Sequence, residues 1–341
     1  MEVVLRVAGC APADQTAEFL SRVEEAGFAG VGIPDTQLIM RDVYVTLALA
    51  AQRTSHLTLY TAVTNPVTRH VSVLASLVQT VEELAPGRVR IIVGSGYSAV
   101  RTIGQKAAPL RQMRETVLTL QRLLSGERVS LDGFEAHLPY ASGRPIPILI
   151  AATGPRTIEL AGEVADGALL SVGVHPAMMD SAWRRLEAGA LKAGRDPHSL
   201  EVIYVSRVYV AKDVETARAM ARPICAQWAI EPYRAQWLRE AGLEIPDIEL
   251  PPELKRLYPD IPHAENWEEA RRLTSFLSDK MVAEICDVIG LFGTPEYFAR
   301  KLAELERHGL RRLFLQTTES YAFPEGTLQA FRDEIFPQLR A

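Results

Sequence analysis

Apolar and polar positions follow two alternating patterns along most of this chain. A short apolar run is followed by a segment in which apolar residues recur three and four positions apart, and this pair of patterns then repeats. The runs lie at eight places, 3–7, 30–33, 57–63, 89–93, 147–151, 167–172, 202–210 and 312–315. Each run predicts a buried strand, and the segment after it predicts a helix. The sequence therefore predicts an α/β fold with parallel strands.

Two architectures fit this alternation, a closed (β/α)8 TIM barrel and an open doubly wound sheet. The count of eight units and the lack of a glycine-rich dinucleotide turn after the run at 3–7 favour the barrel. Barrels of roughly 250 residues often carry insertions, which suits a chain of 341 residues. We therefore expect one TIM-barrel domain over 1–341, with insertions.

The pattern breaks between 231 and 278. Five prolines lie in this charged, irregular segment between amphipathic helices, at Pro246, Pro251, Pro252, Pro259 and Pro262. We expect a helical and irregular insertion over or beside the barrel mouth. A lid or interface and a plain solvated loop both remain open for this segment.

The corner that follows the run at 57–63 carries several polar groups. The strand stops at Thr64-Asn65-Pro66, because proline removes a backbone donor, and helical spacing resumes at Val71. In a barrel, the loops after the carboxyl ends of strands build the active site. The candidate site residues of this corner are Thr61, Thr64, Asn65, Arg69 and His70.

Composition narrows the function classes. The chain is 48% hydrophobic and 23% charged, as is ordinary for a soluble enzyme. Its formal net charge is −5, which is not the excess of positive charge that nucleic-acid binding requires. Arg6 interrupts the first apolar run, which is too short for a signal peptide or a membrane span, so we expect a cytoplasmic protein without a membrane partner. Three cysteines, Cys10, Cys225 and Cys286, lack metal-ligand spacing, and we expect free thiols and no metal.

Several segments together carry a family resemblance. They run from GFAGVGIPDTQLIMRDVYVTLALAA through VTNPVTRH, ELAPGR and GSGYSAVR to AATGPRTIELAGEVADG, with GTPEYFARKL late in the chain. This set resembles the luciferase-like flavin or deazaflavin oxidoreductases, above all the branch similar to methylenetetrahydromethanopterin reductase. The resemblance implies a TIM barrel of the bacterial luciferase-like type whose mouth holds the ring of coenzyme F420, or alternatively of FMN. Relatives are often dimers, so we expect a homodimer.

The resemblance also implies where the cofactor lies. Family members have a non-prolyl cis peptide in the third strand, which maps onto Ala62-Val63, and Asp35 borders the ring. The other role open to Asp35 is capping the next segment. The implied cofactor-binding residues are Asp35, Thr61, Ala62, Val63, Thr64, Gly94, Ser95, Gly96, Ala152, Thr153, Gly154, Pro155, Arg156 and Ser171.

Two of these segments can be weighed on physical grounds. Glycines in Gly94-Ser95-Gly96 would let the backbone approach a ring closely, or would form a tight turn. Gly154-Pro155-Arg156 puts proline at the first helical position and leaves free amides at a helix N-terminus, which suits a cofactor phosphate. The alternative is an ordinary strand-to-helix turn with Arg156 in solvent.

This chain departs from the family pattern at two carboxylates. It has Ala8-Gly9-Cys10 where the pterin reductases carry a carboxylate, and Tyr97 where relatives usually read GxGDSAV. Tyr97 could act as a general acid or as an aromatic wall of the substrate pocket. His70 could donate a proton, but a capping role is favoured because it begins a helix. The catalytic candidates are Tyr97, Asp35 and His70, and a pterin substrate does not follow from the resemblance.

These observations predict an F420-dependent oxidoreductase that transfers a hydride between reduced deazaflavin and a small organic substrate. The main alternative is an FMN-dependent luciferase-like monooxygenase. A metal-dependent barrel hydrolase or lyase would need clustered histidines and carboxylates at strand ends, and the sequence has only Asp35 and seven scattered histidines. A binder of the cofactor without catalytic activity is also open.

Overall fold

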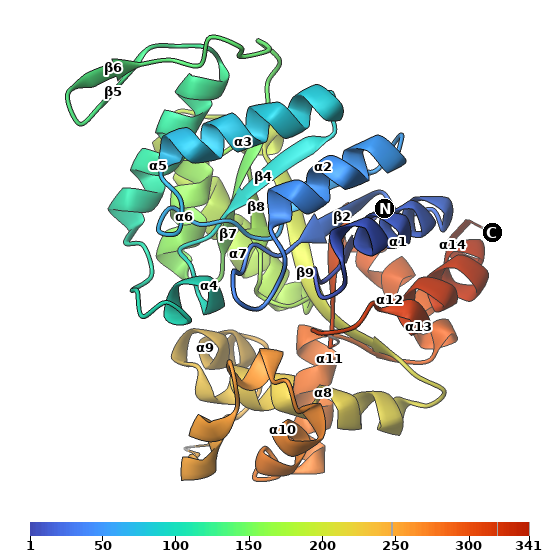
Figure 1. Ribbon diagram of the computed structural model, residues 1–341. Coiled ribbons are helices and arrows are strands. Elements are labelled where there is room, and N and C mark those ends of the chain that lie inside the picture. Colours follow the sequence, from blue (N-terminus) through green and yellow to red (C-terminus); the bar gives the residue numbers. More distant parts are fainter. Residues whose placement is uncertain (247, 319, 341) are drawn as a thin grey trace. The chain divides into compact units, whose positions relative to one another are not determined.

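The computed structural model describes residues 1–246, 248–318 and 320–340 (Figure 1). The chain divides into two compact units. We call the first, made of Val4–Leu169 and Arg184–Val202, the N-terminal unit. The second, made of Met1–Val3, Leu170–Trp183 and Ile203–Ala341, is the C-terminal unit. Each is described by itself below.

Parallel strands form the centre of the N-terminal unit. Neighbours in this sheet follow the chain order β1 (Glu2–Arg6), β2 (Gly30–Ile33), β3 (Thr58–Thr61), β4 (Val89–Val93), β7 (Ile148–Ala152) and β8 (Gly167–Leu170). Val31 of β2 lies between Leu5 of β1 and Leu59 of β3, and all three side chains are fully buried. Because the strands are parallel neighbours, the loops after them lie at one edge of the sheet.

Helices follow these strands. They are α1 (Ala13–Glu25), α2 (Val43–Arg53), α3 (Val71–Leu84), α4 (Ser98–Arg101), α5 (Leu110–Leu124) and α6 (Pro155–Val164). Figure 1 shows α1, α2 and α3 side by side, and each of these helices packs on the next. An antiparallel hairpin, β5 (Val129–Leu131) and β6 (Phe134–Ala136), precedes β7.

The C-terminal unit is built around the long strand β9 (Glu201–Val210). It pairs in parallel with β10 (Gly290–Gly293) and with β11 (Arg312–Thr317). The helices of this unit are α8 (Val214–Ile230), α9 (Pro232–Glu240), α10 (Trp267–Leu273), α11 (Asp279–Ile289), α12 (Pro295–Arg307), α13 (Glu325–Ala330) and α14 (Phe336–Arg340). The first half of α7 (Pro176–Lys192) also belongs to it, and the second half belongs to the N-terminal unit. The segment 231–278 contains α9, α10 and two short 3-10 helices, and its place over a mouth stays a prediction.

All eight predicted strands are present, with small differences at their ends. The third strand ends at Thr61 rather than at residue 63, and Thr64 makes a separate bridge to Val93. One described strand of the parallel sheet was not predicted: β10 begins at Gly290 directly after α11 ends at Ile289, and only this glycine separates the apolar residues of helix and strand.

Glu24, near the end of α1, stabilises the turn before β3. Its Oε1 accepts hydrogen bonds from the backbone N–H groups of Ser55, His56 and Leu57 at 2.9, 2.6 and 2.8 Å. Partial burial alone would raise the pKa of the Glu24 carboxyl, but these three donors outweigh it and the pKa is lowered.

We expect Glu24→Gln to lose about 1–2 kcal/mol of unfolding free energy at neutral pH, because an amide accepts these bonds less strongly than a carboxylate. A lowered folded-state pKa means that the stabilisation is complete above the unfolded-state pKa and is lost as the pH falls through the folded-state pKa. The difference between variant and wild type should therefore shrink in acid. Urea unfolding at neutral and acidic pH measures it, with the exposed Glu25→Gln as control. A pH-independent difference would contradict the prediction.

Candidate functional site

Asp35 lies in the loop after β2, and its side chain is only 2% exposed. Its Oδ2 accepts a hydrogen bond from Thr64 Oγ1 at 2.8 Å and another from Arg69 Nη1. The charge of this buried carboxylate is therefore balanced by a guanidinium from the loop after β3. Asp35 is held as an acceptor, which fits a positioning role better than proton donation.

Arg69 connects this carboxylate to a helix start. Its Nη2 donates to Asp42 Oδ2 at 2.8 Å, while Asp42 Oδ1 caps α2 by accepting from the backbone N–H groups of Tyr44 and Val45. Burial alone would lower the pKa of Arg69, but the hydrogen bond and charge of Asp35 outweigh it and the pKa is raised. The guanidinium also lies 5.3 Å from the centre of the Tyr44 ring. Burial raises the pKa of Tyr44.

The end of β3 joins this group to β4. Thr61 Oγ1 accepts from Ile92 N at 2.9 Å and donates to Ile92 O at 3.2 Å. The hydroxyl of Thr61 is thus used inside the sheet, a role that the sequence pattern did not reveal. The peptide bond Ala62-Val63 is cis, as the family resemblance predicted.

Gly94, directly after β4, lies against the cis peptide segment. Its N–H donates to Thr64 O at 2.8 Å, and a Cβ added to Gly94 would lie 2.7 Å from Val63 Cγ2. The next two residues continue the same edge, where Ser95 O accepts from Ala108 N at 2.7 Å and Gly96 has a φ of +93°. Gly94 is buried and Ser95 and Gly96 are half-buried, so the two glycines make this a closely packed loop with little side-chain bulk.

Two predicted catalytic residues lie in the following loops. Tyr97 directly precedes α4, is 43% exposed, and has the Arg101 guanidinium 5.1 Å from its ring centre. His70 is the N-cap of α3, where its Nδ1 lies 2.7 Å from Ser72 Oγ and 3.4 Å from Ser72 N. The histidine ring therefore caps its helix, the role that its position favoured.

The start of α6 has the geometry that the sequence predicted. β7 ends at Ala152, Gly154 is the N-cap, and Pro155 is the first helical residue. No side chain caps the N-terminus of α6, and Arg156 is exposed. The first-turn N–H groups point toward the N-terminus and form a suitable place for an anion. Thr153 lies between strand and cap, whereas Ser171 follows β8 in the C-terminal unit.

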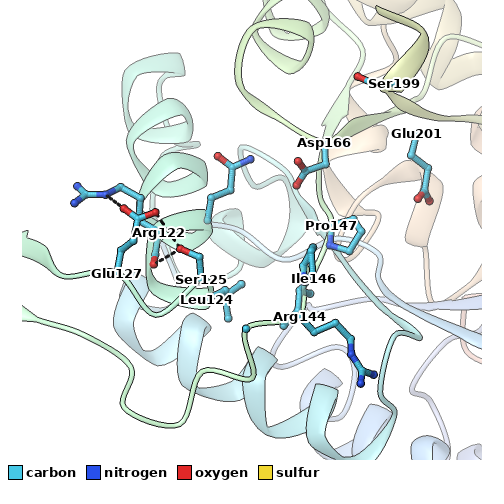
Figure 2. A pocket seen from close by; sticks show the side chains of 13 residues that line it. Arg122, Leu124, Ser125, Glu127, Arg144, Ile146, Pro147, Asp166, Ser199 and Glu201 are labelled. Carbon is cyan, nitrogen blue, oxygen red and sulfur yellow. Dashed lines mark hydrogen bonds and ion pairs between the residues drawn. The ribbon is translucent and has the colours of Figure 1, made fainter. Parts of the chain in front are cut away.

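A separate polar pocket lies in the N-terminal unit at the amino ends of strands. Figure 2 shows Pro147, Asp166 and Glu201, which precede or begin β7, β8 and β9, around a cavity of about 640 Å³. Its polar groups pair with the protein: Asp166 accepts from Ile148 N at 2.8 Å, and Glu201 binds Arg90 at 3.2 Å. Since barrel sites form at carboxyl ends of strands, this pocket is not the candidate site.

Sequence reasoning placed the site loops but missed one of their main contacts. The pairing of Asp35 with Arg69 joins residues from two different loops, and Tyr44 was not a candidate. The sequence did contain a signal for this pairing, because an acidic residue and an arginine follow two neighbouring strands.

In the described ranges 1–246, 248–318 and 320–340, no three histidine, cysteine or acidic side chains are grouped as metal ligands. Within the same ranges no helix is long and apolar enough to cross a membrane.

Residues 4–312 match the family model described as luciferase-like monooxygenase. The chain belongs to this family. A 5,10-methylenetetrahydromethanopterin reductase of Methanolobus tindarius is 34% identical to this luciferase-like protein over 222 residues, which cover 63% of the chain and 67% of the reductase. The enzyme of the same name from Archaeoglobus fulgidus is 27% identical over 333 residues, which cover 94% of this chain and 95% of that enzyme.

A solved structure settles the fold of this luciferase-like protein. The coenzyme F420 dependent tetrahydromethanopterin reductase from Methanopyrus kandleri superposes with a TM-score of 0.78 and 20% identity, covering 99% of both chains. At this identity the likeness shows the fold alone. The predicted (β/α)8 TIM barrel of the luciferase-like type is confirmed, and the doubly wound alternative is wrong.

Proposed function

We propose that this protein is a coenzyme F420-dependent oxidoreductase that transfers a hydride between the reduced deazaflavin and a small organic substrate. The observation that carries the proposal is the likeness of this chain to two reductases of one activity, over 63% of the chain for one and 94% for the other. Support for F420 comes from the Methanopyrus kandleri reductase, which depends on that cofactor and has the same fold. The relatives' pterin substrate is not part of the proposal.

The residues after β2, β3, β4 and β7 fit such a cofactor. Gly94 packs so closely on Val63 that an added Cβ would lie 2.7 Å from Val63 Cγ2, and the side chains of Asp35, Arg69 and Thr64 form a fixed, charge-balanced group one loop away. We assign ring contact to the loop residues 61–64 and 94–96. The uncapped amides at the start of α6, from Gly154 on, would hold a phosphate of the cofactor.

The bound deazaflavin would supply the hydride, and the chain's own residues would position and shield it. Asp35 is tied to Arg69, and His70 caps α3, so both are already bound to protein groups. Tyr97 is 43% exposed, and its side chain does not cap the helix that follows it. We assign it to the substrate side of the site, as proton donor or aromatic wall.

Cofactor choice is tested by thermal unfolding in the presence of each ligand. We expect oxidised F420 to stabilise the protein by about 2.7 kcal/mol at one hundred times its Kd, because a ligand that binds only the folded state stabilises by mass action. FMN at the same concentration is expected to have no effect. Protection by FMN and not by F420 would replace the proposal with the monooxygenase that the family description suggests. Protection by F420 without turnover of reduced cofactor would indicate a binding protein.

We also propose a homodimer that works in the cytoplasm, in line with the family resemblance. Sedimentation equilibrium of the purified chain measures the first property. A monomer at micromolar concentration would contradict it.

A further inference from the structure

A polar cluster lies where α8 meets α9 in the C-terminal unit, and the proposed function makes no use of it. Its members are Gln227 and Trp228 near the end of α8, Glu231 between the helices, and Arg234 in α9. Gln227 is 3% exposed and Trp228 is 1% exposed. Gln227 and Trp228 are therefore buried, whereas the side chains of Glu231 and Arg234 are 30% and 16% exposed.

Direct contacts join the four side chains. Glu231 Oε1 accepts from Gln227 Nε2 at 2.9 Å, and Glu231 Oε2 accepts from Arg234 Nε at 2.6 Å. The Arg234 guanidinium also lies 5.0 Å from the centre of the Trp228 ring. The carboxylate thus fixes the amide and the guanidinium, and the guanidinium stacks on the indole.

Three buried polar atoms of this cluster have no hydrogen-bond partner among the described residues. They are the acceptor Gln227 Oε1 and the donors Trp228 Nε1 and Arg234 Nη1. A buried polar atom without a partner costs about 1–3 kcal/mol. Nearly all buried polar groups in native folds are paired, so three unpaired atoms in one connected network require an explanation. Two of these atoms are donors and one is an acceptor. A ligand group that both accepts and donates hydrogen bonds could therefore pair with them.

Charge limits what that group can be. Glu231 already balances the charge of Arg234, so the cluster is neutral as it stands. A carboxylate placed here would add a second negative charge next to Glu231 in a site with little water. A neutral group that offers a C=O beside an N–H uses both kinds of atom without that cost, because its oxygen accepts and its N–H donates. The Arg234 side chain, 16% exposed, is the member that solvent reaches most easily apart from the carboxylate.

We propose that Gln227, Trp228 and Arg234 form a binding site for the amide or lactam group of a small molecule. The ligand oxygen accepts from Trp228 Nε1 and Arg234 Nη1, and the ligand N–H donates to Gln227 Oε1. Entry requires the Arg234 guanidinium to move aside, because the three atoms are covered in the absence of a ligand. The site does not depend on the cofactor, so its test is independent of the test of the proposed function.

The test uses the indole N–H signals of the full-length protein labelled with nitrogen-15. The chain has four tryptophans, and Trp228→Phe identifies the signal of Trp228 by its loss. We expect 2-pyridone to shift this signal in a saturable way with a Kd of about 1 mM, which is reasonable for so small a ligand. Benzoate, which is similar in size and anionic, is expected to bind at least about tenfold more weakly, a difference of about 1.4 kcal/mol.

Two arginine variants separate recognition from a structural effect. Arg234→Lys keeps the charge but loses the planar pair of donors, and should weaken 2-pyridone binding at least about fivefold. Arg239→Lys, an exposed position on the same helix, should leave binding unchanged. No saturable shift of the Trp228 signal, tighter binding of benzoate, or equal binding by both variants would each overturn the proposal. A crystal structure with 2-pyridone that shows only a bridging water at the three atoms would also overturn it.

Discussion

Arg69→Met is expected to lower the unfolding free energy by about 3–5 kcal/mol, because it leaves the buried carboxylate of Asp35 without its counter-charge. The Asp35 side chain is 2% exposed, and the hydrogen bond from Thr64 Oγ1 would remain after the substitution. A hydroxyl offers one hydrogen bond and no charge, which is insufficient for a carboxylate out of water. Equilibrium unfolding in urea measures the loss.

A double-mutant cycle shows whether the loss belongs to the pair. Asp35→Asn removes the charge that Arg69 balances, so the combination with Arg69→Met should be less destabilised than the two single losses added together. The matched control is Arg111→Met, whose ion pair with Glu115 is 84% and 59% exposed and should contribute less than about 0.5 kcal/mol. Additive losses at positions 35 and 69, or an equal loss at 111, would contradict a buried ion pair.

The loops of the site were predictable because strand ends are visible in the sequence. Pro66 lies in the loop after β3, Pro155 begins a helix, and the glycines at 94 and 96 follow an apolar run. In parallel sheets the carboxyl ends of neighbouring strands share one edge, so naming the strands already brings these loops together. Asp35, Thr64 and Gly94 were found in this way. In the structure, the Thr64 side chain donates a hydrogen bond to Asp35, and the Thr64 carbonyl oxygen accepts one from the backbone N–H of Gly94.

Other features depend on contacts that local pattern does not encode. The hydroxyl of Thr61 was a candidate ligand group, yet it bonds to the backbone of Ile92 in the neighbouring strand. β10 was missed because it begins directly where α11 ends, with only Gly290 between the apolar residues of the helix and those of the strand. Gly290, its first residue, pairs with Arg207 of β9, where an added Cβ would lie 1.9 Å from the Arg207 carbonyl oxygen. Only the partner strand explains why glycine stands there.

Gly94→Ala should weaken binding of the cofactor at least about tenfold, a loss of about 1.4 kcal/mol, under the proposed function. The new methyl carbon would lie 2.7 Å from Val63 Cγ2, a distance that forces Val63 or the loop after β4 to move. Val63 belongs to the segment that we assign to ring contact, so movement of either partner displaces the surface that the ring would rest on. Fluorescence titration with F420 measures the affinity.

The control for this glycine is Gly326→Ala in α13. An added Cβ there meets nothing within 4 Å, and the helical backbone favours alanine over glycine, so stability should rise slightly and F420 affinity should not change. Thermal unfolding of Gly94→Ala shows whether the substitution lowers stability, which the F420 titration alone does not measure. If Gly94→Ala kept wild-type affinity while the melting temperature fell, Gly94 would serve packing alone and the ring would have to bind away from the loop after β4. If both affinity and melting temperature were unchanged, Val63 would have space to move that the structure does not show.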